Sequence, residues 1–230
     1  MEIREALRTT GAVRAFDGTP VDRRTIYDLL DTARFAPSGG NRQCWRVVVV
    51  EDPEKRRALR DAYLPGWYEY LALSKAGLVP FAVVNDLDEE AAALRDAPAM
   101  AAHARSGPGG FAEHLDEVPA LLVVLADLRH VAAMDRGDGA TTFVGGASVY
   151  PFAWSILLAA RDAGLGGVMT TMVRRRDADV RAILGCEPHH EVACVLALGR
   201  PIARPTKLTR SSVESFATID VVEGAPLEPA

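Results

Sequence analysis

An α+β fold is predicted by short buried strands that alternate with helical segments. Three runs have the apolar, β-branched composition of buried strands: Trp45–Val50, Pro119–Ala126 and Val192–Leu198. A fourth, short strand is expected after the glycine-rich turn at Gly164. No internal repeat and no linker divides the 230 residues, so we expect one domain over residues 1–230.

The helices are predicted by the spacing of their apolar side chains and by their end signals. The clearest segment is Val21–Arg34, which follows the N-cap residue Asp22 and is ended by Pro37. Val149–Ala163 is apolar all round and should cross the core. Further helical segments are expected at Ile3–Leu7, Asp52–Ala62, Trp67–Tyr70, Asp177–Leu184 and from Asp86 onward.

The composition is that of a globular protein and excludes wholesale disorder, because 49% of the residues are hydrophobic and 25% are charged. A net charge of −5 argues against a protein that coats nucleic acid. Charges at Glu2, Arg4 and Glu5 stand where a secretory signal is apolar, and no apolar run approaches the about 18 residues of a membrane helix. We therefore expect a cytoplasmic protein with no nucleic-acid partner and no membrane partner.

Cysteine and histidine spacing predicts neither a disulfide framework nor a metal site. The three cysteines, Cys44, Cys186 and Cys194, include no CxxC pair. His189 and His190 lie in a turn-like stretch and lack the i, i+4 spacing of a helical metal pair.

Three separated segments have the residues that a planar, anionic ligand requires: Arg8–Arg14, Pro37–Gln43 and Lys207–Arg210. Their Arg and Lys side chains can neutralise a phosphate, and the Ser-Gly-Gly-Asn loop lets backbone donors approach closely. Amide side chains at Asn41 and Gln43 can read the edge of a ring. Since GxSxG, P-loop, HExxH and GxGxxG motifs are missing from the sequence, cofactor chemistry is the expected enzymology.

Two of these segments, taken together, resemble the opening of FMN-dependent nitroreductases. One is Arg8-Thr-Thr-Gly-Ala-Val-Arg14-Ala-Phe16. The other and more specific one is Ala36-Pro-Ser-Gly-Gly-Asn-Arg-Gln-Cys-Trp45, before a valine strand. The resemblance extends to later segments of that family, Pro151–Thr171 and Lys207–Glu214, and so covers nearly the whole chain.

The resemblance implies a nitroreductase-like α+β fold with a central mixed sheet flanked by helices. It also implies an intertwined homodimer that binds FMN at the subunit interface. The C-terminal tail, about residues 206–230, would then pack on the partner subunit. This suits a segment that has Val221 and Val222 but little else to form a core of its own.

Carried over position by position, the resemblance implies FMN contacts in four segments and no metal ligand. The N-terminal contacts, at the phosphate and at the ribityl or pyrimidine end, correspond to Arg8, Thr10 and Arg14. The loop around the flavin corresponds to Pro37, Ser38, Gly39, Asn41 and Gln43. The segment whose backbone approaches flavin N5 corresponds to Met169, Thr170 and Thr171, and the C-terminal phosphate contacts to Lys207 and Arg210.

The sequence departs from the family pattern at three places. Gly11 stands where similar proteins often carry a basic residue, which would shift phosphate binding onto the other cations of the site. Cys44 replaces the usual proline before Trp45, and Trp154-Ser155 replaces an amide pair. We expect Cys44 to be a small buried residue rather than a reactive thiol.

The implied activity passes electrons from NADH or NADPH through flavin N5 to a small-molecule acceptor, a nitro compound, quinone or enone, with ping-pong kinetics. The protein would need no catalytic acid or base, and Arg14 would act as an electrostatic tuner. A flavin-dependent oxidase or dehydrogenase of a specialised metabolite is an alternative, and Gly11 keeps open a non-catalytic flavin-binding protein. We interpret Arg174–Arg176 as a solvated helix start and Trp67–Tyr70 as packing residues. For both runs we prefer this interpretation to a direct contact with a ligand.

Overall fold

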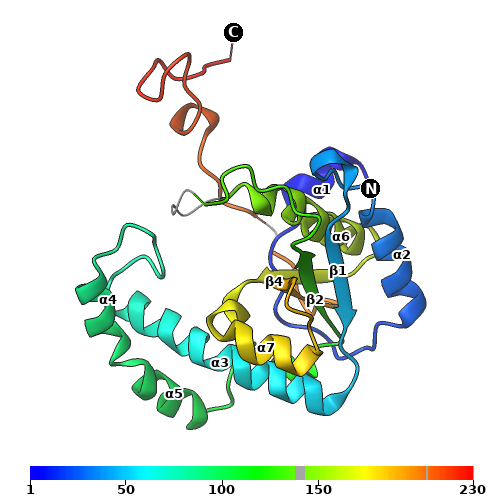
Figure 1. Cartoon of the computed structure of the whole chain (residues 1–230), viewed down its shortest axis with the longest axis vertical. Helices are drawn as coiled ribbons and strands as arrows, with labels where there is room; N and C mark the ends of the chain where they lie inside the picture. Colours follow the sequence, from blue (N-terminus) through cyan, green and yellow to red (C-terminus); the bar gives the residue numbers. More distant parts are fainter. Residues whose placement is uncertain (138–142, 206, 230) are drawn as a thin grey trace.

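The computed structural model describes residues 1–137, 143–205 and 207–229, and its centre is a four-stranded sheet in the order β1-β2-β4-β3 (Figure 1). The sheet confirms the predicted strand positions to within a few residues. Its strands are β1 (Trp45–Val49), β2 (Ala120–Asp127), β3 (Gly166–Thr170) and β4 (His190–Gly199). The central strand β2 is buried over its whole length, as its apolar sequence predicts.

The sheet is antiparallel between its strands, although a mixed sheet was expected from the family resemblance. The last two strands in the chain run in opposite directions because η4 (Met172–Arg176) and α7 (Asp177–Leu184) return the chain to the end at which β3 stops. Within the described residues, parallel pairing is limited to an isolated bridge between Ala12 and Gly167.

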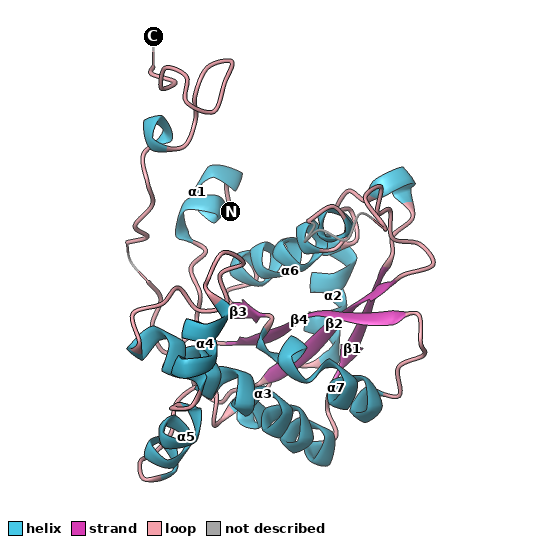
Figure 2. Ribbon diagram, turned by 60° about the vertical axis from the view of Figure 1, so that its left-hand side comes forward, coloured by secondary structure: helices cyan, strands magenta, loops and turns pink. Residues whose placement is uncertain are grey.

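Helices cover both faces of the sheet (Figure 2). On one face α2 (Arg23–Ala33) and α6 (Tyr150–Asp162) pack on side chains that include Leu122 and Val124. On the other face α3 (Pro53–Lys75) and α7 pack on a cluster that includes Val123. Successive residues of β2 therefore supply two separate cores, which is the alternation expected of a buried strand.

Three shorter helices lie at the periphery. They are α1 (Ile3–Thr9), α4 (Leu87–Leu94) and α5 (Ala97–Arg105), and the last two extend from the end of α3 (Figure 1). The Asp86 side chain caps α4 by accepting hydrogen bonds from the backbone N–H groups of Asp88 and Glu89. Asp22 caps α2 in the same way, with Thr25 as the donor at 2.7 Å. Both caps confirm the predicted helix starts.

The helix α3 is continuous, whereas the sequence predicted separate segments at Asp52–Ala62 and Trp67–Tyr70. Pro65 lies inside it. A proline removes one intrahelical hydrogen bond, and tertiary packing on both sides of the residue can compensate for that loss. Here Leu59 before the proline and Leu73 after it are both buried.

The last described segment, residues 207–229, leaves the body of the molecule (Figures 1 and 2). It carries exposed large apolar side chains: Val213, Phe216, Ile219, Val221, Val222 and Leu227. Exposed apolar side chains gathered on one segment mark an interaction surface more often than a solvated one. Within the described part of the chain, no helix combines the length and the apolar character needed to cross a membrane.

Candidate functional site

The chain after α1 lies along the edge strand β3, and this contact places Arg14. The Val13 N–H donates a hydrogen bond of 2.9 Å to the Gly167 carbonyl, and the Asp17 N–H donates one of 3.0 Å to the Arg200 carbonyl. The Val13 side chain is buried against the sheet, whereas Arg14 is exposed. The Arg14 guanidinium is thus held at the edge of the sheet by main-chain bonds of its neighbours.

Two glycines of β3 allow close packing on two different neighbours. A Cβ at Gly166 would lie 2.8 Å from a methyl carbon of Val13, and a Cβ at Gly167 would lie 2.7 Å from the Ala197 carbonyl oxygen. Both distances are shorter than real Cβ contacts allow. The N-terminal segment can therefore pack on β3 only because Gly166 carries no side chain, whereas the missing side chain at Gly167 lets β3 pack on β4.

Arg14 lines a cavity of about 630 Å³ between β3 and α3. The sequence-predicted residues Met169, Thr170 and Thr171 line the same cavity. Two of the four predicted flavin segments, far apart in the sequence, are therefore brought together. The remaining walls are formed by residues that the sequence analysis did not assign to the site: Tyr63, Trp67, Tyr70, Phe111, Val168 and Met172.

Three aromatic residues of α3 form one wall of this cavity. Tyr63, Trp67 and Tyr70 have the spacing i, i+4, i+7, which puts them on one face of a helix. The Tyr63 hydroxyl is 3.2 Å from Thr170 Oγ1, and burial raises the pKa of Tyr63, so the hydroxyl stays protonated. The rings of Trp67 and Tyr70 lie within 8° of parallel. This spacing was the signal that could have assigned Trp67 and Tyr70 to the site.

Gly66 sets how closely the chain after β3 approaches α3. A Cβ at Gly66 would lie 2.9 Å from Arg175 Cγ and 3.1 Å from Met172 Cγ. A side chain at this position would push η4 away from the helix. The glycine therefore keeps Met172 over the cavity.

A second, smaller cavity of about 340 Å³ shares Arg14 and Phe111 with the first. His114 lies in its wall, with Nε2 2.7 Å from the Pro108 carbonyl oxygen and Nδ1 3.2 Å from the Glu117 carboxylate. These two acceptors raise the pKa of His114. Arg14 thus lies between two cavities. A ligand larger than a single ring system therefore has room on both sides of Arg14.

The loop Pro37–Gln43 forms a tight turn before β1. Asn41 and Gln43 both have positive φ angles, 52° and 48°, in the left-handed region that side-chain-bearing residues seldom occupy. The Gln43 N–H donates to the Ser38 hydroxyl at 3.0 Å, and the Gln43 amide reaches back to the Asn41 oxygens at 3.4 Å. Backbone conformations of this kind are concentrated at ligand-binding sites, where the surrounding structure holds them in place.

The loop is anchored at the start of α6. The Gly39 N–H donates to the hydroxyl of buried Ser148 at 3.0 Å, and the Cys44 thiol donates to the Ser148 carbonyl at 3.7 Å. Cys44 is fully buried, and this burial raises the pKa of its thiol. The expectation that Cys44 is a small buried residue is confirmed.

One chain does not bring the loop Pro37–Gln43 to the cavity. The loop precedes β1, whereas Arg14 and Met169–Thr171 belong to the side of β3. These strands are the two opposite edges of the sheet, separated by three strand spacings or about 14 Å. No residue of the loop is among those that line the cavity.

The N-terminal segment and the start of the tail approach each other at Gly11. A Cβ there would lie 2.8 Å from Leu208 Cδ2 and 2.9 Å from Pro205 Cγ. Gly11 is therefore the point at which the start of the tail rests on the N-terminal segment, with no room for a side chain. The predicted phosphate contacts lie on either side of this crossing: Arg8, Thr10, Lys207 and Arg210.

Most of these polar groups remain available to an anion. In the residues that the structure describes, no carboxylate forms an ion pair with Arg8, Arg14, Lys207 or Arg210. The hydroxyl of Thr10 donates to the Ala6 carbonyl at 2.7 Å, so its proton serves to end α1. Its oxygen can still accept a hydrogen bond from a ligand, but its proton is not available to an anion.

The arginine run at the end of η4, directly before α7, has structural partners. Arg174 pairs with Asp177 and Glu191 at 2.6 Å each. Arg175 pairs with Glu69, also at 2.6 Å. Two of the three positive charges are therefore neutralised within the chain, which favours the interpretation as a helix start.

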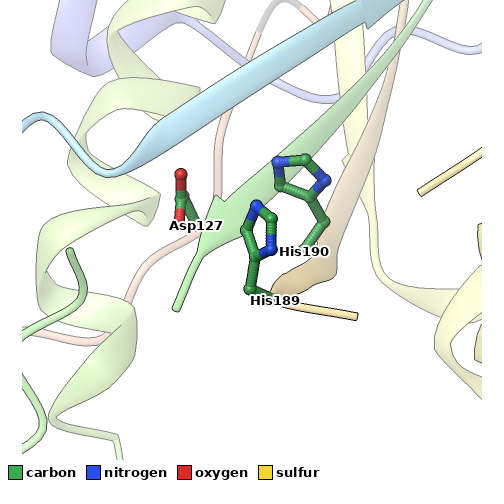
Figure 3. Close-up of side chains that lie close together, drawn as sticks. All are labelled: Asp127, His189 and His190. Atoms are coloured by element: carbon green, nitrogen blue, oxygen red, sulfur yellow. The ribbon is translucent and has the colours of Figure 1, made fainter. Parts of the chain in front are cut away.

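Asp127, His189 and His190 lie close together where β2 ends and β4 begins, and their potential ligand atoms are within 4.8 Å of one another (Figure 3). The carboxylate is already engaged. Its Oδ1 accepts from the N–H and Nε of Arg129, and its Oδ2 accepts from Arg129 Nη2 at 2.7 Å and Arg46 Nη2 at 3.4 Å. Four donors occupy the lone pairs of the carboxylate, and the hydrogen bonds from Arg129 hold the pKa of Asp127 well below its usual range. The cluster is an ion-pair network at the sheet end rather than a ready set of metal ligands.

Comparison with protein families supports the resemblance that the motifs indicated. Residues 7–200 match the model of the Nitroreductase family. An NADH dehydrogenase of Thermus thermophilus is 32% identical over 198 residues, which cover 83% of this chain and 82% of that protein. Iodotyrosine deiodinase 1 of Pongo abelii is 28% identical over 201 residues, which cover 87% of this chain but only 61% of the deiodinase.

Solved structures of low sequence identity share the fold. A BluB-like flavoprotein from Clostridium difficile superimposes with a TM-score of 0.68 at 19% identity, covering 95% of this chain and 99% of that one. The NfrA1 nitroreductase of Bacillus subtilis gives a TM-score of 0.66 at 16% identity, covering 96% and 75%.

The burial of the cysteines predicts how they react with a thiol reagent such as Ellman's reagent. In guanidinium chloride all three should titrate. In the native protein we expect Cys44 and Cys194 to be silent, because both are fully buried and burial raises the pKa of Cys194 to about 12. Slow labelling should be confined to half-buried Cys186 and should vanish in Cys186→Ser. Rapid labelling of Cys44 in the native state would contradict its assignment as a core residue.

Proposed function

Because the chain belongs to the nitroreductase family, a family of flavin oxidoreductases, we propose that its flavin is FMN and that NADH or NADPH is the electron donor. The acceptor is a small organic molecule such as a quinone, a nitro compound or an enone, reduced in a ping-pong cycle. With a quinone the balance is quinone plus NAD(P)H plus one proton to hydroquinone plus NAD(P)+. The observation that carries the proposal is the cavity in which Arg14 meets Met169–Thr171.

The residues present fit the parts of FMN. FMN supplies hydride acceptance at a flat tricyclic ring, which the apolar and aromatic cavity walls can contact. Arg14 and the Thr170 hydroxyl supply polar groups at the cavity. Arg8, Lys207 and Arg210 supply cations that no carboxylate of the described chain neutralises, as a phosphate requires.

Arg14 has an electrostatic task in this proposal. A fixed cation at the pyrimidine end of the ring favours the addition of negative charge there. In the described chain the Asp17 carboxylate, the alternative partner for Arg14, forms no ion pair with it and instead accepts a hydrogen bond of 2.8 Å from the N–H of Thr19. Arg14 therefore keeps its charge free for the cavity.

The loop Pro37–Gln43 and Arg14 lie at opposite edges of the sheet, and this separation supports a homodimer. If residues of the loop contact the same flavin as Arg14, that loop must belong to a second subunit. The tail of residues 207–229 supports the same arrangement, because its exposed apolar side chains need a covering surface. We also propose that the protein acts in the cytoplasm and that its substrates are small molecules.

The visible spectrum of freshly purified protein tests the function first. We expect a flavin absorption band that bleaches anaerobically on addition of NADH or NADPH and returns when a quinone is added. A flavin that ignores both nicotinamides but is reduced by another metabolite would support an oxidase or dehydrogenase instead. A colourless protein that cannot be reconstituted with FMN would contradict the proposal.

The anion site predicts selective losses of FMN affinity. Lys207→Ala and Arg210→Ala should each weaken FMN binding by about 1.5–3 kcal/mol, the range for a hydrogen bond to a charged group. Riboflavin, which lacks the phosphate, should bind both variants as it binds the native protein, and Lys55→Ala on the exposed face of α3 should change neither affinity. Equal losses for FMN and riboflavin would show that these residues act on folding or on the ring.

Replacing Arg14 predicts a change in the flavin's midpoint potential. Arg14→Gln removes the cation and should lower the potential by about 30 mV, which corresponds to about 1.4 kcal/mol for a two-electron couple. Reference dyes can measure this on the FMN-saturated variant, so that occupancy does not enter. An unchanged potential would end the electrostatic role and leave the family assignment intact.

The tail predicts the oligomeric state. Truncation after Pro205 removes the exposed apolar segment and should convert a dimer into monomers or aggregates, as measured by light scattering. Its FMN content should fall as well. A truncated protein that stays a flavin-loaded dimer would refute the role of the tail.

A further inference from the structure

The loop of residues 106–110 connects α5 to Phe111, which lines both cavities beside Arg14. Three of its five residues are glycines, so the loop has little to fix its own course. The side chain that reaches back to it is His114, which directly precedes η2 (Leu115–Glu117). We propose that His114 is a positioning residue, whose protonated ring holds this loop and Phe111 in the place that binds the acceptor. This inference rests on the proposed function of the cavity and concerns the pH range in which the acceptor is bound well.

The two ring nitrogens of His114 both face hydrogen-bond acceptors. Nε2 lies 2.7 Å from the Pro108 carbonyl oxygen, and Nδ1 lies 3.2 Å from a carboxylate oxygen of Glu117. A neutral imidazole has a single N–H, so one of its nitrogens would turn a lone pair toward an oxygen. Since only the imidazolium donates to both oxygens, the geometry selects the charged form of the ring.

The hydrogen bonds around the ring form a turn that carries Phe111. The Gly110 N–H donates to the Glu113 carboxylate at 2.7 Å, and the His114 N–H donates to the Gly110 carbonyl at 3.2 Å. Gly109 has a φ of +72°, and a Cβ there would lie 2.8 Å from Glu113 Cβ and 3.2 Å from His114 Nε2. The loop therefore packs directly on the ring. Because Phe111 follows this loop and lies inside the turn, its position depends on that contact.

The charges near the ring favour its protonated form. On its own turn they are Glu113, Asp116 and Glu117, and the charged or titratable groups on neighbouring elements are Arg14, Arg56, Arg60 and Tyr68. Arg60 pairs with Asp116 at 2.9 Å, which leaves Glu117 as the carboxylate in contact with the ring. The hydrogen bond to the loop carbonyl, and after it the one to Glu117, raise the pKa of His114.

The raised pKa fixes the direction of the pH dependence. The stabilisation by the imidazolium is fully present below the ordinary histidine pKa of 6.5 and is lost as the pH rises through the higher pKa of the folded protein. Above that pH one of the two hydrogen bonds of the ring is lost. The loop is then held less firmly, and the acceptor meets a less ordered wall at Phe111.

Histidine NMR measures the ring without any turnover. In the full-length protein as purified, the ring signal of His114, identified by its loss in His114→Gln, should titrate with a pKa above the ordinary value. Glu117→Gln should lower this pKa, because the amide no longer supplies a negative charge. Glu89→Gln, on exposed Glu89 of α4, should leave it unchanged. A ring whose pKa is not raised would overturn the proposal.

The KM for a quinone as a function of pH tests the positioning role. With menadione and FMN-saturated enzyme, KM should rise about threefold between about pH 6 and about pH 9, a size in keeping with a half-exposed ion pair. His114→Gln should show the high KM at every pH. In Glu117→Gln the midpoint of the rise should move to lower pH together with the NMR pKa, which a merely structural role of His114 does not require. His103→Gln, on exposed His103 of α5, should keep the native profile.

The outcomes separate this inference from the function on which it rests. If the native flavin is not bleached by NADH or NADPH, the proposed function fails, and the role of His114 toward an acceptor fails with it. If the flavin is bleached but His114→Gln keeps the native dependence of KM on pH, the positioning role alone is overturned. Should His114→Gln not fold, Glu117→Gln decides: a midpoint that follows the lowered pKa supports the proposal, and a midpoint that stays in place overturns it.

Discussion

The hydrogen bond from the Val13 N–H to the Gly167 carbonyl fixes the position on which the site depends. It attaches the N-terminal segment to the free edge of β3, and the absence of a side chain at Gly166 is what permits the approach. Arg14 is the next residue after the bond, so the cation reaches the cavity without any ion pair of its own. Electrostatic stabilisation works best from groups that need no rearrangement, and a charge placed by backbone bonds meets that condition.

Much of this arrangement could be predicted from local signals. Asp22 and Asp86 cap their helices as their sequence positions indicate, and the buried strands follow from β-branched runs. Met169–Thr171 and Arg14 could be paired because motif resemblance carries long-range information that periodicity lacks. The strand directions and the continuity of α3 through Pro65 could not be predicted, because both depend on tertiary packing that compensates a local cost.

The continuity of α3 also explains why the aromatic wall was missed. Divided at Pro65, the helix separates Tyr63 from Trp67 and Tyr70, and the i, i+4, i+7 face cannot be recognised. The same physical argument that assigned Trp67 and Tyr70 to packing was correct for Tyr63, which the core does bury. A short helix face can therefore belong partly to the core and partly to a ligand cavity, and exposure distinguishes the two parts.

In the proposed dimer, the crossing of the tail over Gly11 would link subunit association to cofactor binding, two equilibria that would otherwise be independent. Pro205 and Leu208 rest on the backbone between Arg8 and Arg14, so a partner chain that orders the tail also orders the anion contacts. Thermodynamic reciprocity then requires that cofactor binding strengthens subunit association by the same factor by which association strengthens cofactor binding. Such a dimer would release its flavin on dilution, and the retention of the flavin in the cell would depend on the concentration of the protein as much as on that of the free cofactor.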